Sequence, residues 1–295
     1  MTSNRDQLFI DRMSTLISDR ENELYKAKEI KIRHNARKIL NKTVFEKVFF
    51  LMRTGISWSD IQFLQGVAGN IHYQSIYKRF QKWNQYDILQ HAWKKLFEKY
   101  KNSRLSKDAT HFTNLYIDTT MIKNLAGRDC TGGNPTDRGR LATKVSIIID
   151  KNKIPVSEPV FYPANKNDIS TIEGTIDKMP FDLRIDGRRT LKLAGDKAYR
   201  SKVLAQKIVL TKKIRIVSQP KKNEKHAAKI GQRDKSMFKN RIYIEHFFGM
   251  LKRMKRLRLR SDRNVCNYKA FWFIHISRMT FNALVGNISN NILFD

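Results

Sequence analysis

Cysteine is scarce in this sequence, and Cys130 and Cys266 are the two examples among its 295 residues. Two cysteines are too few for a disulfide framework, and neither belongs to a Cys-x-x-Cys pair. The seven histidines are scattered without the spacing of a zinc finger. These absences exclude a disulfide-stapled scaffold and a zinc-finger protein, and they favour a reducing, intracellular setting.

Long hydrophobic runs are also missing. Residues 1–11 are polar and lack the apolar core of a signal peptide. The most apolar stretch, Phe271–Val285, is interrupted by His275, Arg278 and Asn282, so it is too short and too polar to span a bilayer. No Gly-x4-Gly-Lys-Ser/Thr loop indicates a P-loop ATPase, and no Gly-x-Ser-x-Gly elbow indicates an α/β hydrolase. We expect a cytoplasmic protein without a membrane partner.

Acidic residues are outnumbered by basic ones, with 27 Asp and Glu against 58 Lys and Arg. The formal net charge of +31 exceeds what solubility requires and predicts a polyanionic partner, with nucleic acid first. Any single basic run is also typical of a solvated surface. An acidic membrane surface is the weaker alternative, because no helix near a terminus pairs a basic face with a large apolar one.

Helical spacing dominates the first hundred residues. Apolar residues recur from Val44 to Met52 and stop at Gly55, a candidate C-cap. A second, short helix follows, residues 66–70 break it, and residues 75–83 begin another. Two short helices around such a turn predict a helix-turn-helix, with a plain helical bundle equally favoured. The later helix would bury Ile76, Phe80 and Trp83 and offer DNA-binding residues on its outer face, namely Lys78, Arg79 and Lys82.

Strand patterns begin after a polar linker at residues 101–113. Short β-branched or apolar runs alternate with helical segments, which predicts an α/β fold with a mixed sheet flanked by helices. The expected strands are 115–118, 144–150, 154–162, 191–194 and 214–217, and the expected helices are 168–179 and 199–210. The predicted domains are a helical, helix-turn-helix-like DNA-binding domain at 1–105 and an α/β domain at 106–295, with a basic insertion at 219–236 and a C-terminal helix.

Two aspartates end predicted strands, Asp118 after the run LYI and Asp196 after LAG. Ligands gather at the carboxyl ends of neighbouring strands in an α/β sheet. Two carboxylates brought together there repel each other unless a cation lies between them, and oxygen ligands suit Mg²⁺ or Mn²⁺. Taken singly, either aspartate is more typical of a turn cap.

A third acidic residue lies on a predicted long helix at residues 238–257. Helical spacing places Arg241, Glu245 and Lys252 on one narrow stripe, together with Phe248. The opposite side is apolar and forms the core face. The helix therefore presents one carboxylate flanked by two cations on a face not needed for packing, although Arg241 and Glu245 also suit an ordinary surface ion pair.

These features resemble the DDE transposases of bacterial insertion sequences, in the broad group that includes insertion sequences four and five. The family signature is Tyr-x2-Arg-x3-Glu-x6-Lys, and the matching segment runs from Phe238 to Lys252, with Phe in place of Tyr. The segment LYIDTT, with Asp118, and the segment LAGDKAYRS, with Asp196, resemble the other two acid-bearing segments of the family.

The resemblance implies a ribonuclease H-like catalytic domain in which Asp118, Asp196 and Glu245 hold two Mg²⁺ or Mn²⁺ ions. It implies metal-dependent DNA cleavage and strand transfer at insertion-sequence ends. Double-stranded DNA, as transposon ends and target, would be the partner of a homodimer in a synaptic complex. The protein would be associated with the nucleoid, or lie in the nucleus of a eukaryotic host. The residues expected to bind DNA phosphates are Arg241, Lys252, Arg253, Lys255 and Arg256, in a basic track that ends at Arg260.

Three alternatives stay open at this point. The chain could be an inactive or domesticated DNA-binding relative, although the presence of all three acids argues mildly against decay. It could be another ribonuclease H-like nuclease. A non-enzymatic nucleic-acid-binding protein would also explain the charge, and it would show no metal dependence.

Overall fold

The computed structural model describes residues 3–30, 39–63, 71–184, 190–220 and 231–286. These residues form two compact units. The first, the helical unit, contains the described residues up to Phe97, residues 253–258 and those from Cys266 onward. The second, the sheet unit, contains residues 98–252 and 259–265. The boundary predicted at residue 105, with the C-terminal helix in the α/β domain, differs from this division because that helix packs among the N-terminal helices.

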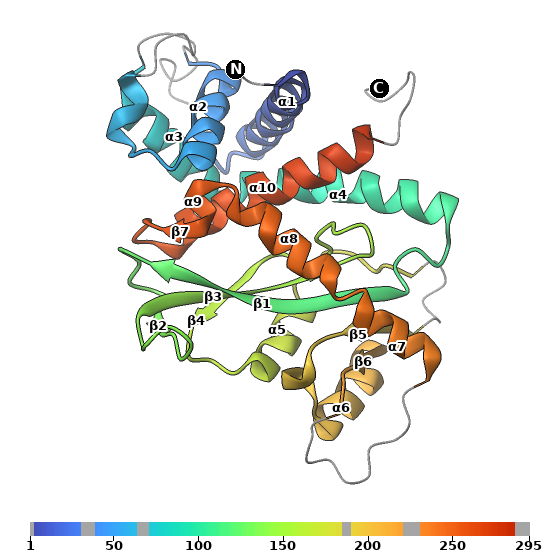
Figure 1. Cartoon of the computed structure of the whole chain (residues 1–295). Coiled ribbons are helices and arrows are strands. Elements are labelled where there is room, and N and C mark those ends of the chain that lie inside the picture. Colours follow the sequence, from blue (N-terminus) through green and yellow to red (C-terminus); the bar gives the residue numbers. More distant parts are fainter. Residues whose placement is uncertain (1–2, 31–38, 64–70, 185–189, 221–230, 287–295) are drawn as a thin grey trace. The chain divides into compact units, whose positions relative to one another are not determined.

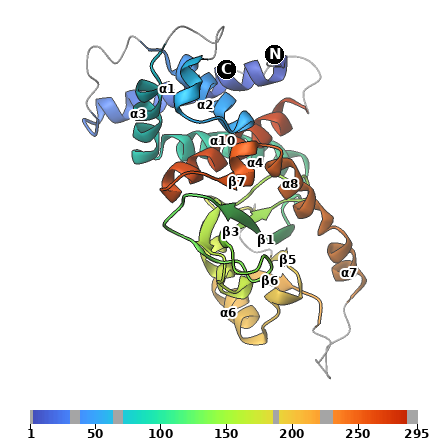
Figure 2. The same cartoon turned by 60° about the vertical axis from the view of Figure 1, so that its left-hand side comes forward.

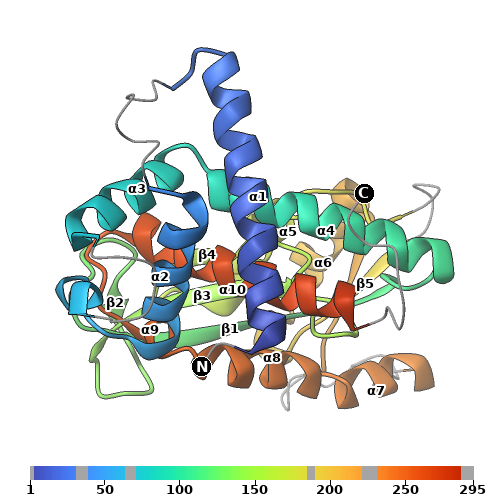
Figure 3. The same ribbon diagram turned by 90° about the horizontal axis from the view of Figure 1, so that it is seen from above.

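Aromatic packing holds the helical unit together. Its elements are α1 (Asn4–Lys26), α2 (Asn41–Thr54), the 3-10 turn η2 (Ser59–Phe63), α3 (Tyr73–Gln85), the start of α4 (Ile88–Lys107), α9 (Lys255–Arg258) and α10 (Val265–Val285). Figure 3 shows α1 and α2 beside one another, with α10 beneath them. The ring of Phe9 on α1 lies 5.7 Å from Phe45, 5.6 Å from Phe49 and 5.7 Å from Phe281. This cluster explains why the C-terminal helix belongs to the helical unit.

Local sequence signals set the end of α2. Gly55 follows it in the left-handed conformation, with φ of 71°, and its N–H donates to the Leu51 carbonyl at 2.9 Å, as predicted. The short helix expected next is a 3-10 turn at 59–63, and residues 66–70 lie outside the described part of the chain. The helix-turn-helix therefore stays a prediction, although α3 buries its predicted inner face, namely Ile76, Phe80 and Trp83.

A mixed sheet forms the centre of the sheet unit (Figure 1). Among the described residues its strands are β1 (Asn114–Asn124), β2 (Gly132–Gly133), β3 (Leu141–Ile149), β4 (Val160–Pro163), β5 (Leu191–Ala194), β6 (Ile214–Val217) and β7 (Leu259–Arg260). The hydrogen-bonded order is β2-β3-β1-β5-β6, with β4 beside β3 and β7 beside the end of β1. The strands β1, β3 and β4 are antiparallel neighbours, whereas β5 and β6 run parallel to β1. This topology confirms the predicted ribonuclease H-like mixed sheet.

Helices cover both faces of the sheet. They are η3 (Asp168–Thr171), α5 (Ile172–Ile176), η4 (Lys197–Tyr199), α6 (Lys202–Lys212), α7 (Gln232–Lys239) and α8 (Ile242–Lys252). In Figures 1 and 2, α8 lies along β1 on one face and α5 lies on the other. The ring of Tyr243 meets that of Tyr116 at 5.5 Å, and Thr175 of α5 donates to Ser146 of β3 at 2.8 Å. Because side chains alternate along a strand, Asp118 shares the α8 face with Tyr116.

The helix α4 extends through Lys107 into residues that the sequence predicts as a linker. Tyr100 on this extension is buried, and its hydroxyl donates to the buried carboxylate of Asp150 at 2.6 Å. The same carboxylate lies 3.0 Å from Nε2 of His111. The predicted linker therefore contains a buried polar network, which hydrophobic periodicity does not reveal.

Two other predicted elements are shorter than expected. Pro155 has no N–H to donate and makes one isolated bridge with Ile149, so regular pairing begins at Val160 rather than at residue 154. The predicted helix at 238–257 is divided into α7, α8 and α9 by turns at residues 240–241 and 253–254. None of the described helices combines the length and apolar character that crossing a membrane requires.

Candidate active site

Asp118 and Asp196 lie at the same edge of the sheet. Tyr116 of β1 pairs in register with Ala194 of the parallel strand β5, and each aspartate comes two residues later. The sequence therefore predicts correctly that both carboxylates follow neighbouring strands. Asp196 is also the N-cap of η4, where its Oδ1 accepts the N–H of Ala198 at 2.7 Å. The capping role and the site role coexist in this residue.

The carboxylate of Asp118 is strongly affected by its surroundings. Burial raises its pKa to about 6, and the negative charges of Asp196 and Asp168 act in the same direction. The N–H of Thr119, which donates to Oδ1 at 2.8 Å, and the guanidinium of Arg241 act in the opposite direction. The mutual repulsion places Asp118 and Asp196 in one electrostatic neighbourhood, and a bound cation would relieve it.

Asp168 belongs to the same neighbourhood, although the sequence indicates only that it begins a helix. Its Oδ1 accepts the Thr119 hydroxyl at 2.9 Å and the Lys144 ammonium at 2.7 Å. The Lys144 side chain is 5% exposed, so this cation is buried beside the acids. The spacing of 50 residues between Asp118 and Asp168 gives no local signal for their proximity.

Tyr199 is a further site residue that sequence reasoning missed. Its side chain is fully buried, and burial raises the pKa of its hydroxyl well above the usual value. The charges of Asp118, Asp168 and Asp196 raise it further, so the hydroxyl keeps its proton. The Asp-x2-Tyr spacing after a strand is the local signal that could have identified it.

Glu245 is held less closely. It is exposed on α8, one helical turn after Arg241, whose Nη2 lies 3.6 Å from Oδ2 of Asp118. Its neighbours Ile244, Phe247 and Phe248 are buried, so the predicted core face is correct except that Phe248 joins it. Glu245 is not among the charges that act on Asp118.

The donor set fits a divalent cation in kind. All the acids offer oxygen ligands, which suit Mg²⁺ or Mn²⁺, and repulsion among them favours a cation. Within the described ranges, however, no three His, Cys, Asp or Glu side chains are gathered closely enough to hold a metal ion. The structure thus brings Asp118, Asp168 and Asp196 together and leaves Glu245 on the adjoining helix.

Two of the residues predicted to bind DNA are committed to internal contacts. Arg256 is 6% exposed, donates to the Ile56 carbonyl at 3.3 Å and lies over a ring of the helical unit. Arg79 contacts Glu21 at 3.1 Å and Asn41 at 2.8 Å. A buried arginine cannot be told from a surface arginine by composition, which explains both errors. The other predicted contacts are exposed or half-buried, namely Lys78, Lys82, Arg241, Lys252, Arg253 and Lys255.

The end of the predicted basic track is also internal. Arg260 of β7 is fully buried, and its guanidinium donates to the Asp129 carboxylate, to the Asp129 carbonyl at 2.7 Å and to the Thr143 hydroxyl at 2.8 Å. This arginine ties the segment after β1 to β3. It is a structural residue of the sheet unit.

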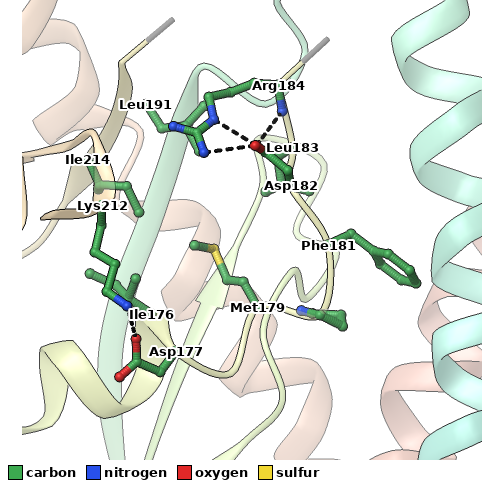
Figure 4. Close-up of a pocket in the computed structure, with 11 residues that line it drawn as sticks. Ile176, Asp177, Met179, Phe181, Asp182, Leu183, Arg184, Leu191, Lys212 and Ile214 are labelled. Carbon is green, nitrogen blue, oxygen red and sulfur yellow. Dashed lines mark hydrogen bonds and ion pairs between the residues drawn. The ribbon is translucent and has the colours of Figure 1, made fainter. Parts of the chain in front are cut away.

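A cavity of about 340 Å³ in the sheet unit lies away from these acids (Figure 4). Its walls include Leu191 and Ile214, which begin β5 and β6, whereas Asp196 follows the end of β5. An ion pair between Lys212 and Asp177, at 2.6 Å, lies at its rim. The cavity is therefore at the opposite edge of the sheet, and the candidate active site is the open carboxylate cluster.

Known proteins share this sequence pattern. Residues 108–280 match the family described as the Transposase DDE domain, over more than half of the chain. A putative transposase for insertion sequence element IS402 from Burkholderia cepacia is 28% identical over 161 residues, which is 54% of this chain and 72% of the relative.

Two solved structures have weak likeness to the chain. A piggyBac transposase synaptic complex with hairpin DNA has a TM-score of 0.46 at 9% identity, over 96% of this chain and 74% of that one. The Mos1 strand transfer complex has a TM-score of 0.27 at 8% identity, over 82% and 77%. No argument rests on likeness at this level. On the sequence match, the chain belongs to the DDE transposase domain family.

Proposed function

We propose that this protein cuts DNA at the ends of an insertion sequence and joins the freed strands to target DNA, using Asp118, Asp196 and Glu245 to hold two Mg²⁺ or Mn²⁺ ions. The observation that carries the proposal is the repulsive proximity of Asp118 and Asp196 at the carboxyl end of parallel strands. Membership of the transposase family supports the same activity.

The divalent cations, when bound, would activate a water or a DNA 3′-hydroxyl and stabilise the leaving 3′-oxygen. The chain's own residues would orient the DNA and hold the carboxylates. Arg241 would leave Asp118 and bind a phosphate of the scissile strand, because DNA brings the competing negative charge. Glu245, on the same helix, would then complete the carboxylate set. Lys252 would bind the DNA backbone one face further along α8.

The test is a cleavage and strand-transfer assay on a duplex that carries the terminal inverted repeats flanking the coding sequence. Asp118→Asn, Asp196→Asn and Glu245→Gln should each abolish Mg²⁺-dependent cleavage and retain DNA binding. Asp177→Asn removes an exposed carboxylate at the opposite edge of the sheet and should retain activity. Wild-type activity in any triad variant would refute the role of that residue.

DNA binding should weaken steeply with added salt, because phosphate contacts release counterions. A chain that binds DNA but never cleaves it, with or without Mg²⁺ or Mn²⁺, would instead be the inactive or domesticated relative. Homodimer formation around paired DNA ends is part of the proposal and is measured by light scattering of the DNA complex.

A further inference from the structure

The hydroxyl of Tyr199 has no hydrogen-bond partner among the described residues, although it is fully buried. A buried hydroxyl normally has a partner, and one without a partner requires an explanation. Thr119 lies close enough to lower the pKa of Tyr199, but its own hydroxyl donates to Asp168. The Tyr199 O–H therefore remains an unused donor inside the protein.

Packing alone does not account for this hydroxyl. The ring of Tyr199 lies against Gly195, where a Cβ atom would come within 2.7 Å of the ring carbon Cδ2. Glycine thus leaves the space that the ring fills, directly before Asp196 in the chain. Phenylalanine would fill that space equally well, so the tyrosine oxygen is an addition that the packing does not require.

The oxygen atoms that surround this donor belong to the carboxylate cluster. Asp118, Asp168 and Asp196 are the three charges that act on the Tyr199 hydroxyl. One oxygen of each is already bonded, by Thr119 N–H, by Thr119 with Lys144, and by Ala198 N–H. In the part of the chain that the structure describes, the Oδ2 atoms of Asp168 and Asp196 have no partner. Donor and acceptors are thus both unused in the metal-free site.

We propose that Tyr199 is a positioning residue of the metal site, whose hydroxyl donates to a carboxylate of the cluster when a divalent cation draws the acids together. This inference rests on the proposed function, since it requires that the cluster bind a cation. A hydrogen bond from outside fixes the orientation of a metal ligand, and loss of such a bond weakens metal affinity. Tyr199 touches neither DNA nor the reacting atoms in this role.

The test compares Tyr199→Phe with the wild-type full chain in Mn²⁺ titrations by calorimetry, without DNA. The variant keeps the ring against Gly195 and removes the oxygen alone. We expect its Mn²⁺ affinity to fall about 10- to 100-fold. Tyr162→Phe is the matched control, because Tyr162 is coupled to Asp177 rather than to the cluster, and its Mn²⁺ affinity should equal that of wild type.

Thermal unfolding without metal separates positioning from ordinary structure. Removing an unpartnered hydroxyl should leave the metal-free Tm of Tyr199→Phe equal to or above that of wild type, whereas the Mn²⁺-induced rise in Tm should shrink. A lower metal-free Tm would mean that the hydroxyl has a structural partner, and it would overturn the inference.

Asp118→Asn distinguishes the two levels of the proposal. If Asp118→Asn loses Mn²⁺ binding and Tyr199→Phe binds as tightly as wild type, the inference about Tyr199 is wrong and the proposed function stands. If Asp118→Asn binds Mn²⁺ as wild type does, or if wild type binds none, both are wrong. Loss in Asp118→Asn with weakened binding in Tyr199→Phe supports both.

Discussion

The guanidinium of Arg241 lies 3.6 Å from the carboxylate of Asp118, measured from Nη2 to Oδ2, and each side chain is 23% exposed. A residue predicted to bind DNA is therefore the counter-ion of a residue predicted to bind metal. The arginine and a metal ion compete for the same carboxylate. DNA would resolve this competition by attracting the arginine to a phosphate.

The first prediction concerns that competition. Arg241→Gln should bind Mn²⁺ several-fold more tightly at pH 8, because a positive charge beside the site is removed. The pKa of Asp118 should rise, because the arginine lowers it in the wild type. Calorimetric Mn²⁺ titration measures the affinity, and its pH dependence reports the carboxylate. Lys239→Gln removes an equal charge from an exposed position on α7 and should change neither quantity. Weaker Mn²⁺ binding in Arg241→Gln would contradict the competition.

The second prediction concerns stability and pH in metal-free protein. The pKa of Asp118 is about 6 in the folded chain, whereas an unfolded aspartate titrates near ~3.9. The folded state holds the proton to higher pH, so this residue's contribution to stability is complete below about pH 4 and is lost as the pH rises through about 6. Asp118→Asn removes that loss and should be more stable than wild type by about 1–3 kcal/mol at pH 7.5.

Urea denaturation at pH 4 and pH 7.5 measures this difference. The advantage of Asp118→Asn should disappear at pH 4, where the wild-type carboxyl is protonated. Asp177→Asn, an exposed control, should show no such dependence. Equal stability of Asp118→Asn and wild type at both pH values would show that the carboxylate is not under strain.

The sequence predicts the backbone frame of the site better than its side-chain composition. Asp118 and Asp196 end apolar runs, and this local pattern is enough to locate two strand ends. Asp168 and Tyr199 join the site through tertiary packing around the edge of β1, for which linear spacing carries no signal. Basic residues are the least predictable class, because Arg256 and Arg260 have the same composition signal as exposed arginines but are buried and hydrogen-bonded.

The third prediction concerns Arg260. Arg260→Ala should destabilise the sheet unit by about 3–5 kcal/mol, because it leaves buried hydrogen-bonding groups around Asp129 and Thr143 unpaired. Arg260→Lys should also destabilise, since one ammonium cannot replace the forked guanidinium. Arg258→Ala, which removes an exposed charge nearby in sequence, should change stability by less than about 0.5 kcal/mol. Chemical denaturation provides the values, and an unchanged midpoint for Arg260→Ala would refute the structural role.

The fourth prediction separates two adjacent basic residues. Lys255 is exposed and Arg256 is buried. Lys255→Ala should weaken DNA binding and reduce its salt dependence without changing the Tm. Arg256→Ala should lower the Tm, because the Ile56 carbonyl loses its donor. DNA binding by fluorescence anisotropy and thermal unfolding together decide this prediction, and interchanged phenotypes would contradict it.

The central claim is that Glu245 joins Asp118 and Asp196 around divalent cations when DNA is bound. Anomalous scattering at the manganese edge, from crystals of the full chain with Mn²⁺ and a terminal-repeat duplex, tests it most directly. We predict anomalous peaks in contact with all three carboxylates and with Arg241 displaced onto a phosphate. Peaks that exclude Glu245, or a DNA complex in which no Mn²⁺ lies beside Asp118 and Asp196, would contradict the account.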